Sequence, residues 1–299
     1  MKVSESVRAV QVPDDNPMHP RSTNIYLVGT GQVLSIDSGE AIDKFRWMLR
    51  GYLAAMERAE IGIAAITHHH FDHSGNLKDL REALKAEIAV PENSVKLLRG
   101  RLPSNGVQTL TNGQVIHLDG GVKVRVIATP GHSVDSLCYY LEEEGVLFTG
   151  DTLLGVGTTT VQDLGAYRQS LQTLVALPNL KLLCPGHGPL VHDARERLQT
   201  YIEHRDMREA QILKVLRRRG PTTSWDIMLE LYQDIDKRLR RAADGNVRAH
   251  LAQLQQEGRL RTRRGKRRRV NPEAAARAKA QQRERRTIVR LAQRYEAED

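Results

Sequence analysis

Cysteine and long apolar runs are both scarce in this 299-residue chain. Its two cysteines, Cys138 and Cys184, lie in apolar, strand-like stretches, which excludes the disulfide framework of a small secreted domain. No apolar run approaches the roughly 18 residues of a membrane span, and the segment Met1 to Val7 lacks the apolar core of a secretory signal. We therefore expect a protein of the cytoplasm with reduced thiols and no membrane partner.

Acidic residues are outnumbered only in the last third of the chain. The whole sequence holds 45 Lys and Arg against 36 Asp and Glu. Residues 201–299 hold 26 basic and 14 acidic residues, which leaves 19 basic and 22 acidic residues for residues 1–200. Because the charge balance changes sign there, the sequence predicts a domain boundary near residues 195–205, with a first domain long enough to bury a core.

The most distinctive stretch is Thr67–His73, which reads THHHFDH. It follows an apolar, β-prone run and precedes a segment with leucines at helical spacing, so it is expected on a turn between a strand and a helix. Four histidines and one aspartate within seven residues supply the imidazole nitrogens and carboxylate oxygen that zinc prefers. In such a turn, His68 and His70 can face one ion while Asp72 and His73 face a neighbouring ion.

Three segments downstream complete this pattern. They are TPGHS at Thr129–Ser133, FTGDT at Phe148–Thr152 and CPGHG at Cys184–Gly188. The four segments, in this order and at these separations, resemble the metallo-β-lactamase superfamily, and the resemblance covers roughly residues 1–195. A surface cluster of histidines would account for one of these segments, but not for all four in order.

The resemblance implies a ligand set for two metal ions. One ion would be held by His68, His70 and His132, the other by Asp72, His73 and His187, with Asp151 bridging both. The ions are expected to be Zn²⁺, two per chain, with Mn²⁺ or Fe as substitutes. Asp72 and Asp151 are the expected catalytic carboxylates of this set.

Asp37 follows a strand-like segment and precedes Ser38 and Gly39. A carboxylate at the end of an inner strand can accept a hydrogen bond from a metal-ligating histidine and fix its orientation. The local sequence suits an Asx turn or a helix N-cap equally well. The resemblance favours the contact with a ligand histidine.

The order of strand-like and helix-like segments indicates an α/β protein with two sheets packed face to face and helices outside. Strands are expected at 7–12, 23–28, 32–37, 61–66, 87–90, 115–118, 122–128, 137–141, 146–148 and 180–184, and helices at 41–59, 77–85 and 163–177. This is the αββα sandwich that the resemblance implies.

Differences from known relatives narrow the expected activity. The commonest true β-lactamases have a cysteine where this chain has Asp151 and no ligand at the position of His73. Diiron oxygen-reducing relatives have a glutamate where His70 stands. Asp151 and His187 are only 36 positions apart, too close for the extra domain of the long-insert RNA-processing nucleases. A compact hydrolase remains, with glyoxalase-II-like thioesterases and lactonases among the candidates.

The last third has the pattern of a small basic domain. Helices are expected at 206–219, 223–232 and 246–257, followed by a basic hairpin over 258–270 that turns at Gly265. This order resembles a winged-helix module appended to a lactamase fold, as in the lactamase-beta-like 2 family, whose best-known members act on single-stranded RNA. We therefore expect a catalytic domain at 1–200, a winged-helix-like domain at 201–272 and a basic C-terminal helix at 273–299.

Seven basic residues of the expected hairpin are the candidate contacts to nucleic acid. They are Arg261, Arg263, Arg264, Lys266, Arg267, Arg268 and Arg269. Such a set can neutralise several phosphates without reading bases. The alternative is that these residues form a solvent-exposed basic face of a domain that only packs against others. The sequence leaves open whether the chain forms a homodimer.

Two enzymatic functions and one binding function fit these patterns. The first is a dinuclear zinc endoribonuclease or phosphodiesterase that cleaves single-stranded RNA, or another polyanion, through a metal-bridging hydroxide. The second is a thioesterase or lactonase acting on small metabolites. The third, a nucleic-acid-binding regulator with a vestigial metal site, is disfavoured because the ligand set is intact.

The remaining histidines lack ligand context in the sequence. They are His19, His69, His117, His192, His204 and His250. Each is expected to be structural or exposed to solvent, and His69 is expected to point away from the metals.

Overall fold

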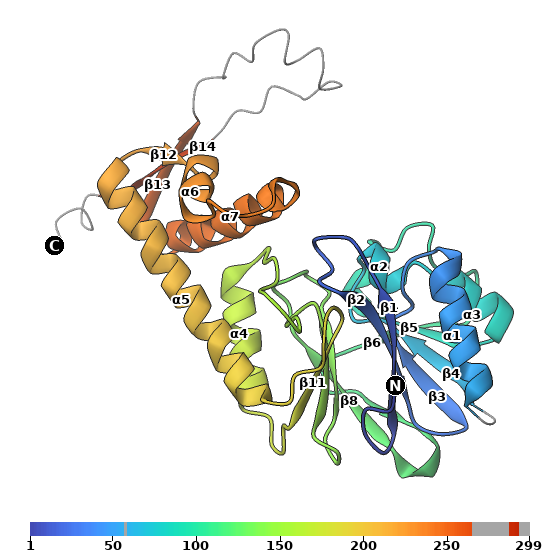
Figure 1. The fold of residues 1–299 in the computed structure, drawn as a ribbon. Helices are drawn as coiled ribbons and strands as arrows, with labels where there is room; N and C mark the ends of the chain where they lie inside the picture. The colour runs from blue at the N-terminus through green and yellow to red at the C-terminus, as the bar shows by residue number, and fades with distance from the viewer. Residues whose placement is uncertain (57–58, 265–286, 293–299) are drawn as a thin grey trace, which may run out of the picture. The chain divides into compact units, whose positions relative to one another are not determined.

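A computed structural model describes residues 1–56, 59–264 and 287–292 of the chain (Figure 1). The chain divides into two compact units, Met1–Ile202 and Glu203–Asp299. The sequence placed the boundary between residues 200 and 201. Among the described residues, no helix has the length and apolar character needed to span a membrane.

Two mixed sheets form the first unit. The first has the order β1-β2-β3-β4-β5-β6 and contains β1 (Val7–Pro13), β2 (Ser22–Val28), β3 (Gln32–Ile36), β4 (Glu60–Ala65), β5 (Glu87–Pro91) and β6 (Val107–Leu110). The second has the order β11-β10-β9-β8-β7 and contains β7 (Val115–His117), β8 (Lys123–Ala128), β9 (Leu137–Leu141), β10 (Val146–Gly150) and β11 (Leu182–Pro185). Strands β3 to β6 run parallel, as do β10 and β11.

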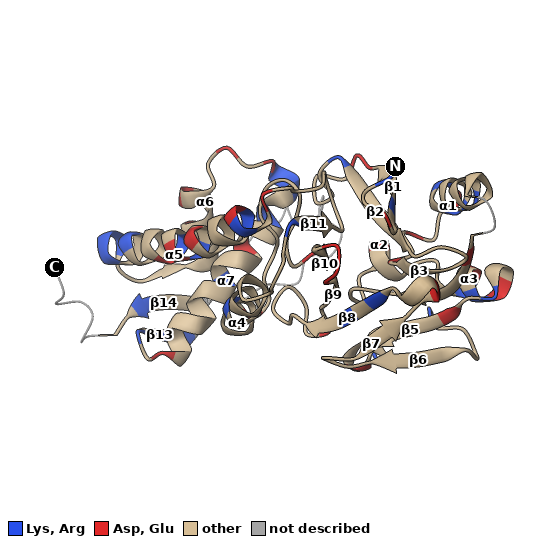
Figure 2. Cartoon of the chain, turned by 90° about the horizontal axis from the view of Figure 1, so that it is seen from below, with Lys and Arg blue, Asp and Glu red and all other residues tan. Residues whose placement is uncertain are grey.

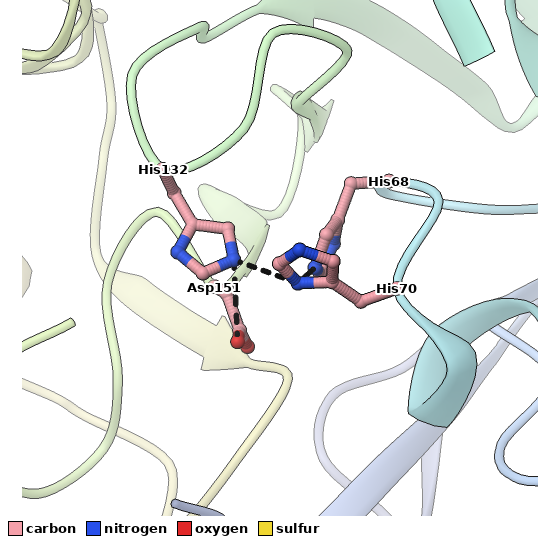
Figure 3. Close-up of side chains that lie close together, drawn as sticks. All are labelled: His68, His70, His132 and Asp151. Carbon is pink, nitrogen blue, oxygen red and sulfur yellow. Dashed lines mark hydrogen bonds and ion pairs between the residues drawn. The ribbon is translucent and has the colours of Figure 1, made fainter. Parts of the chain in front are cut away.

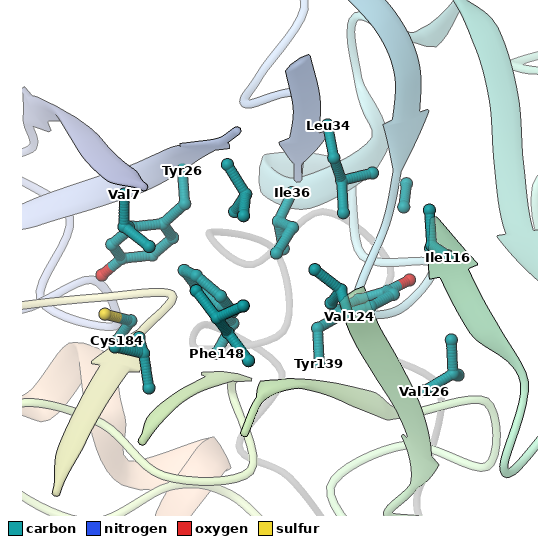
Figure 4. Close-up of a cluster of buried hydrophobic side chains, with 14 of the residues drawn as sticks. Val7, Tyr26, Leu34, Ile36, Ile116, Val124, Val126, Tyr139, Phe148 and Cys184 are labelled. Carbon is teal, nitrogen blue, oxygen red and sulfur yellow. The ribbon is translucent and has the colours of Figure 1, made fainter. Parts of the chain in front are cut away.

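The main core lies between the two sheets. Tyr26 and Ile36 from the first sheet pack with Val124, Tyr139 and Phe148 from the second, and all five are buried (Figure 4). Tyr26 lies opposite Ile36, and Tyr139 lies opposite Phe148, so the two side chains of each pair project from the same face of their sheet. Removing this apolar surface from water is the main force that holds the sheets together.

Helices cover the outer faces of this pair of sheets. Phe45 and Leu49 of α1 (Asp43–Ala55) and Leu77 and Leu80 of α3 (Leu77–Leu84) pack in one buried cluster with Leu27 and other residues of the first sheet. Figure 1 shows α4 (Leu164–Val175) beside the second sheet. The expected αββα sandwich is therefore confirmed.

The second unit contains helices and a small sheet. Helix α5 (Ala194–Arg219) leads into it from the first unit, and α6 (Ser224–Leu231), α7 (Arg240–Gln256) and the strands β12 (Thr222–Thr223), β13 (Leu260–Arg264) and β14 (Thr287–Leu291) follow. The sheet order is β12-β14-β13. Thr223 caps α6, because its hydroxyl accepts a hydrogen bond from the amide of Asp226 at 3.2 Å.

Two helices of this unit begin earlier than the sequence suggested. Helix α5 begins at Ala194 rather than Asp206, because buried Leu198 and Tyr201 continue the apolar face toward the N-terminus. Helix α7 begins at Arg240 rather than Asn246 and contains Gly245 in its interior. A glycine there costs about 1 kcal/mol relative to alanine. Burial of neighbouring side chains on α7 outweighs that cost.

The expectations for the C-terminal segment were partly wrong. Strand β13 pairs with Thr287–Leu291 rather than with residues directly after Gly265. Those five residues form strand β14 and not part of the helix expected over 273–299. Ile288 and Val289 are β-branched, and Val289 and Leu291 are buried on alternate positions, which favours a strand. The rest of the expected helix lies outside the described residues.

Candidate metal centre

The THHHFDH stretch forms a turn between β4 and the short helix α2 (Phe71–Ser74), as expected. Asp37, which directly follows β3, holds the start of this turn: its Oδ1 accepts a hydrogen bond from the amide of Thr67 at 2.7 Å. The side chain of Asp37 is buried and its backbone lies in the left-handed region, with φ of 67°. The turn is thereby fixed at the carboxyl ends of parallel strands.

The other predicted ligands follow the ends of second-sheet strands. His132 comes after β8, Asp151 after β10 and His187 after β11. Because β8, β10 and β11 run in one direction, their carboxyl ends share one edge of the sheet. The fold therefore brings residues from four separate loops to one place.

Four of the side chains form the first group of potential metal ligands. They are His68, His70, His132 and Asp151, whose ligand atoms all lie within 4.8 Å of one another (Figure 3). Nδ1 of His70 lies 2.8 Å from Nε2 of His68 and 3.1 Å from Nε2 of His132. Oδ2 of Asp151 lies 3.6 Å from Nε2 of His132.

The second group consists of Asp72, His73, His187 and again Asp151. Oδ2 of Asp72 lies 2.9 Å from Nε2 of His187 and 3.2 Å from Nε2 of His73. Oδ1 of Asp151 lies 3.3 Å from Nε2 of His187 and 3.4 Å from Nε2 of His73. One carboxylate thus offers one oxygen to each group, which is the arrangement of a bridging ligand.

A buried oxygen without a hydrogen bond supports a cation at this place. Oδ1 of Asp151 is buried and makes no hydrogen bond within the described part of the chain. Buried polar atoms are normally paired, so this oxygen is suited to contact a positive ion. Imidazole nitrogens and carboxylate oxygens at these spacings fit zinc or a similar divalent ion in each group.

Outer hydrogen bonds orient the ligand rings. Oδ2 of Asp37 lies 2.7 Å from Nδ1 of His73, and the carbonyl oxygen of Thr160 lies 2.8 Å from Nδ1 of His132. Each contact can hold a hydrogen on Nδ1 and turns Nε2 of the same ring into the cluster.

Burial and charge favour the protonation states that bind metals. Burial lowers the pKa of His68 well below its usual value, lowers that of His132, and lowers that of His70 to about 4. Burial alone would raise the pKa of Asp72 and Asp151, but the neighbouring ligand histidines hold both values well below the usual range. Three neutral imidazoles and two ionised carboxylates are therefore ready to bind metals.

The second group attracts positive charge. Burial would lower the pKa of His73, but the carboxylates of Asp72, Asp37 and Asp151 raise it well above its usual value. The pKa of His187 is likewise raised, because Asp151 and Asp72 outweigh its burial. The same carboxylates would stabilise a divalent ion in place of these protons.

Glycine is required where loops approach the centre. A Cβ atom added to Gly186 would lie 2.6 Å from Cε1 of His73 and 3.0 Å from Oδ1 of Asp151. A side chain at this position would therefore push apart two members of the second group.

His19 is a neighbour of the site that the sequence did not single out. Its ring stacks on that of His187 with centroids 4.3 Å apart and an angle of 3° between planes. Nδ1 of His19 lies 2.6 Å from Oδ2 of Asp14, and its Nε2 lies 3.2 Å from Oδ2 of Asp72. It comes from the proline-containing loop between β1 and β2, where no spacing relates it to the metal turn.

The other histidines occupy varied places. His117 and His192 are exposed, whereas His250 is buried and contacts the carbonyl oxygens of Asn246 and Arg205 through its two ring nitrogens. His69 belongs to neither ligand group; its Nδ1 lies 2.8 Å from Oδ1 of Asp135.

The structure describes some of the seven basic residues that were predicted to contact nucleic acid. Arg261 and Arg263 are exposed on β13, and Arg264 ends that strand. Figure 2 shows basic residues on β13 and β14 and along α5. The other candidates, Lys266, Arg267, Arg268 and Arg269, lie outside the described residues.

Comparison with known families assigns both parts of the chain. Residues 19–187 match the Metallo-beta-lactamase superfamily, and residues 223–267 match the Beta-lactamase associated winged helix domain.

Two curated relatives extend over most of the sequence. The chain is 34% identical over 262 residues to a beta-lactamase-like protein 2 homolog of Caenorhabditis elegans, covering 86% of both chains. It is 35% identical over 254 residues to an atrochrysone carboxyl ACP thioesterase of Aspergillus fumigatus, covering 83% of this chain and 72% of the relative.

Solved structures show the same architecture. A metallo-beta-lactamase family protein from Thermus thermophilus superposes with a TM-score of 0.72 at 27% identity, covering 86% of this chain and 95% of the other. A beta-lactamase domain protein from Burkholderia ambifaria has a TM-score of 0.82 at 18% identity over 98% of this chain and 93% of the other, a likeness of fold.

Proposed function

This chain belongs to the metallo-β-lactamase superfamily and is a metal-dependent hydrolase, and on that premise we propose that it hydrolyses acyl thioesters. The observation that carries the proposal is the 35% identity to a protein named as an ACP thioesterase, which extends over 83% of this chain. The sequence alone placed RNA first and thioesters second. The named activity of this relative reverses that order.

We propose water, rather than a cysteine, as the nucleophile. Both cysteines are buried, and burial raises the pKa of Cys138 to about 11 and that of Cys184 well above its usual value. A buried thiol of this kind is not reactive near neutral pH. Ions held by the two ligand groups would supply an activated water and polarise the substrate carbonyl.

The ligand side chains hold charges that suit this reaction. Asp72 and Asp151 stay ionised because their pKa values are depressed, so each can hold a cation and accept a hydrogen bond from water. A thiol has a pKa of about 8.5, so a thiolate leaves near neutral pH with little help from a proton donor. Hydrolysis of a thioester therefore depends less on a proton donor among the surrounding side chains than hydrolysis of an alcohol ester or a phosphodiester does.

A second candidate, cleavage of single-stranded RNA, is favoured by one surface of the second unit. Arg261 of β13 lies directly opposite Arg290 of β14, and Arg263 lies two residues along the same strand. All three are exposed, and we call them the arginine face. Like charges opposite each other in a sheet are destabilising, and a phosphate chain on this face would offset that repulsion.

A side-by-side assay distinguishes the two substrates. Zinc-loaded protein is incubated with a panel of small acyl thioesters, with thiol release as the signal, and separately with end-labelled single-stranded RNA. We expect thiol release that is lost in Asp151→Asn and retained in Glu143→Gln, an exposed carboxylate outside both ligand groups.

Either of two outcomes would contradict the preference for thioesters over RNA. If RNA is cleaved to products with 5′-phosphate and 3′-hydroxyl ends while every thioester is untouched, the RNA candidate replaces the first. If both substrates are untouched by fully metal-loaded protein, neither candidate stands.

A further inference from the structure

We propose that His69 is a substrate-contacting residue of this site and that Asp135 is the positioning residue that directs its free nitrogen toward the substrate. This inference rests on the proposed hydrolysis of thioesters. It adds a polar contact from outside the two ligand groups, made by a histidine that sits between two predicted ligands in the sequence.

One side of the His69 ring is fixed by a buried carboxylate. Nδ1 of His69 lies 2.8 Å from Oδ1 of Asp135, whose side chain is fully buried. The same oxygen accepts a hydrogen bond from the hydroxyl of Ser133 at 2.8 Å. Burial alone would raise the pKa of Asp135, but the hydrogen bonds from His69 and Ser133 outweigh it and lower the pKa. The carboxylate is thus ionised and accepts the Nδ1 hydrogen of the ring.

The backbone of His69 is fixed as well. Nη1 of Arg101 donates hydrogen bonds to the carbonyl oxygen of His69 and to Oγ of Ser74, each at 2.5 Å. Oγ of Ser74 in turn donates to the carbonyl oxygens of His69 and His70, at 3.0 and 2.8 Å. Main chain and ring are therefore held independently, so the direction of the ring is set before a substrate arrives.

The second ring nitrogen of His69, Nε2, is available for a hydrogen bond to a substrate. The His69 side chain is 21% exposed, and no hydrogen bond to its Nε2 occurs within residues 1–56, 59–264 and 287–292. Its ring centroid lies 4.7 Å from that of His70, a predicted metal ligand. The partly exposed ring of His69 therefore lies beside a member of the first ligand group, and its Nε2 has no hydrogen bond among these residues.

The contact with Asp135 defines which ring atom can bind a substrate. Asp135 occupies Nδ1, so Nε2 is the ring nitrogen left to form a hydrogen bond. The matching group is a polar group next to the scissile bond, such as an amide or hydroxyl of an acyl thioester. A contact of this kind lies outside the reacting bond and acts mainly on substrate binding.

The test compares His69→Phe, His69→Gln, Asp135→Asn and the double variant His69→Phe/Asp135→Asn as zinc-loaded full-length proteins. The substrate is an N-acetylcysteamine thioester, which carries an amide N–H. We expect His69→Phe to retain the metal content of the wild type and to lose about tenfold in kcat/KM, mostly through a higher KM. His69→Gln retains a side chain that can form a hydrogen bond and should recover part of the loss.

Coupling between the two residues identifies the positioning role. If Asp135 acts through His69, the double variant should be no slower than His69→Phe alone. Additive losses would contradict this, and so would an unchanged kcat/KM in His69→Phe. Lower metal content in His69→Phe would assign the residue to the metal centre instead. If Asp135→Asn does not fold, the His69→Phe and His69→Gln pair still decides whether His69 contacts the substrate.

The outcome for His69 can be separated from the outcome for the proposed function. A wild-type protein that leaves the thioester intact overturns both together. A wild-type protein that cleaves it at the same rate as His69→Phe overturns only the role of His69.

Discussion

Oδ2 of Asp37 lies 2.7 Å from Nδ1 of His73, and both side chains are buried. The other carboxylate oxygen accepts the amide hydrogen of Thr67 at 2.7 Å. One carboxylate at the end of β3 therefore holds both the start of the metal turn and the ring of a ligand. This contact fixes which nitrogen of His73 faces Asp72 and Asp151.

Replacing Asp37 should weaken the second metal site. Asp37→Asn preserves size and tolerates the left-handed backbone of this position, but removes the charge that orients His73. Loss of such an outer partner typically lowers metal affinity about 10- to 100-fold. Zinc affinity is measured by competition with a chromophoric chelator, with Glu143→Gln as the control. Equal affinities in Asp37→Asn and the wild type would show that the contact is dispensable.

His204 should make stability depend on pH. Burial lowers its pKa to about 4, with Arg205 and Arg208 adding to the effect, and its Nδ1 is buried without a hydrogen-bond partner among the described residues. As pH falls from about 6.5 to about 4, the unfolded chain takes up this proton before the folded chain does, so stability falls across that window.

The measurement is the melting temperature of metal-free wild type and His204→Gln over the same pH range. The wild type should lose stability more steeply on acidification than His204→Gln, because the variant has no proton to take up at this position. His192→Gln, which alters an exposed histidine, should follow the wild type. Parallel curves for the wild type and His204→Gln would contradict the account.

The arginine face should carry a measurable part of any RNA affinity. Replacing Arg261, Arg263 and Arg290 by alanine should weaken binding of single-stranded RNA regardless of sequence. It should also reduce the slope of log affinity against log salt by about 2, since each phosphate contact contributes about 0.7. Fluorescence anisotropy over a range of salt concentrations measures both quantities.

Charge and side-chain shape can be separated on this face. Lysine at the same three positions should retain most of the salt slope, because the phosphate contacts need only positive charge. Alanine at Lys78, Lys96 and Arg99, three exposed cations of the first unit, removes the same charge elsewhere. If that control weakens RNA binding as much as the face variant does, the face has no special role.

Much of the fold and the ligand set could be predicted because four segments, in order and at their separations, resemble those of the metallo-β-lactamase superfamily. The strand and helix patterns agree with the αββα sandwich, and the fold brings His68, His132, Asp151 and His187 into two groups that share Asp151. His19 gives no such signal. Its place beside His187 depends on how the loop between β1 and β2 folds back over the site.

The features that could not be predicted are contacts between residues far apart in the sequence. The contact of His69 with Asp135 joins residues 66 positions apart, and neither residue stands in a motif with the other. Strand β13 has its partner in Thr287–Leu291, beyond a connection of 22 residues. The sequence suggested the nearer partner because hairpins usually close over short loops.

Titration of metal-stripped protein with zinc, with thiol release from an acyl thioester as the signal, tests the central claim most directly. The rate should be negligible without metal and reach its maximum at about two equivalents per chain, since seven ligands exceed the needs of one four-coordinate ion. Asp151→Asn should not reach that rate at any zinc concentration. Hydrolysis that is unaffected by stripping, that saturates at about one equivalent, or that proceeds equally in Asp151→Asn would contradict a dinuclear thioester hydrolase.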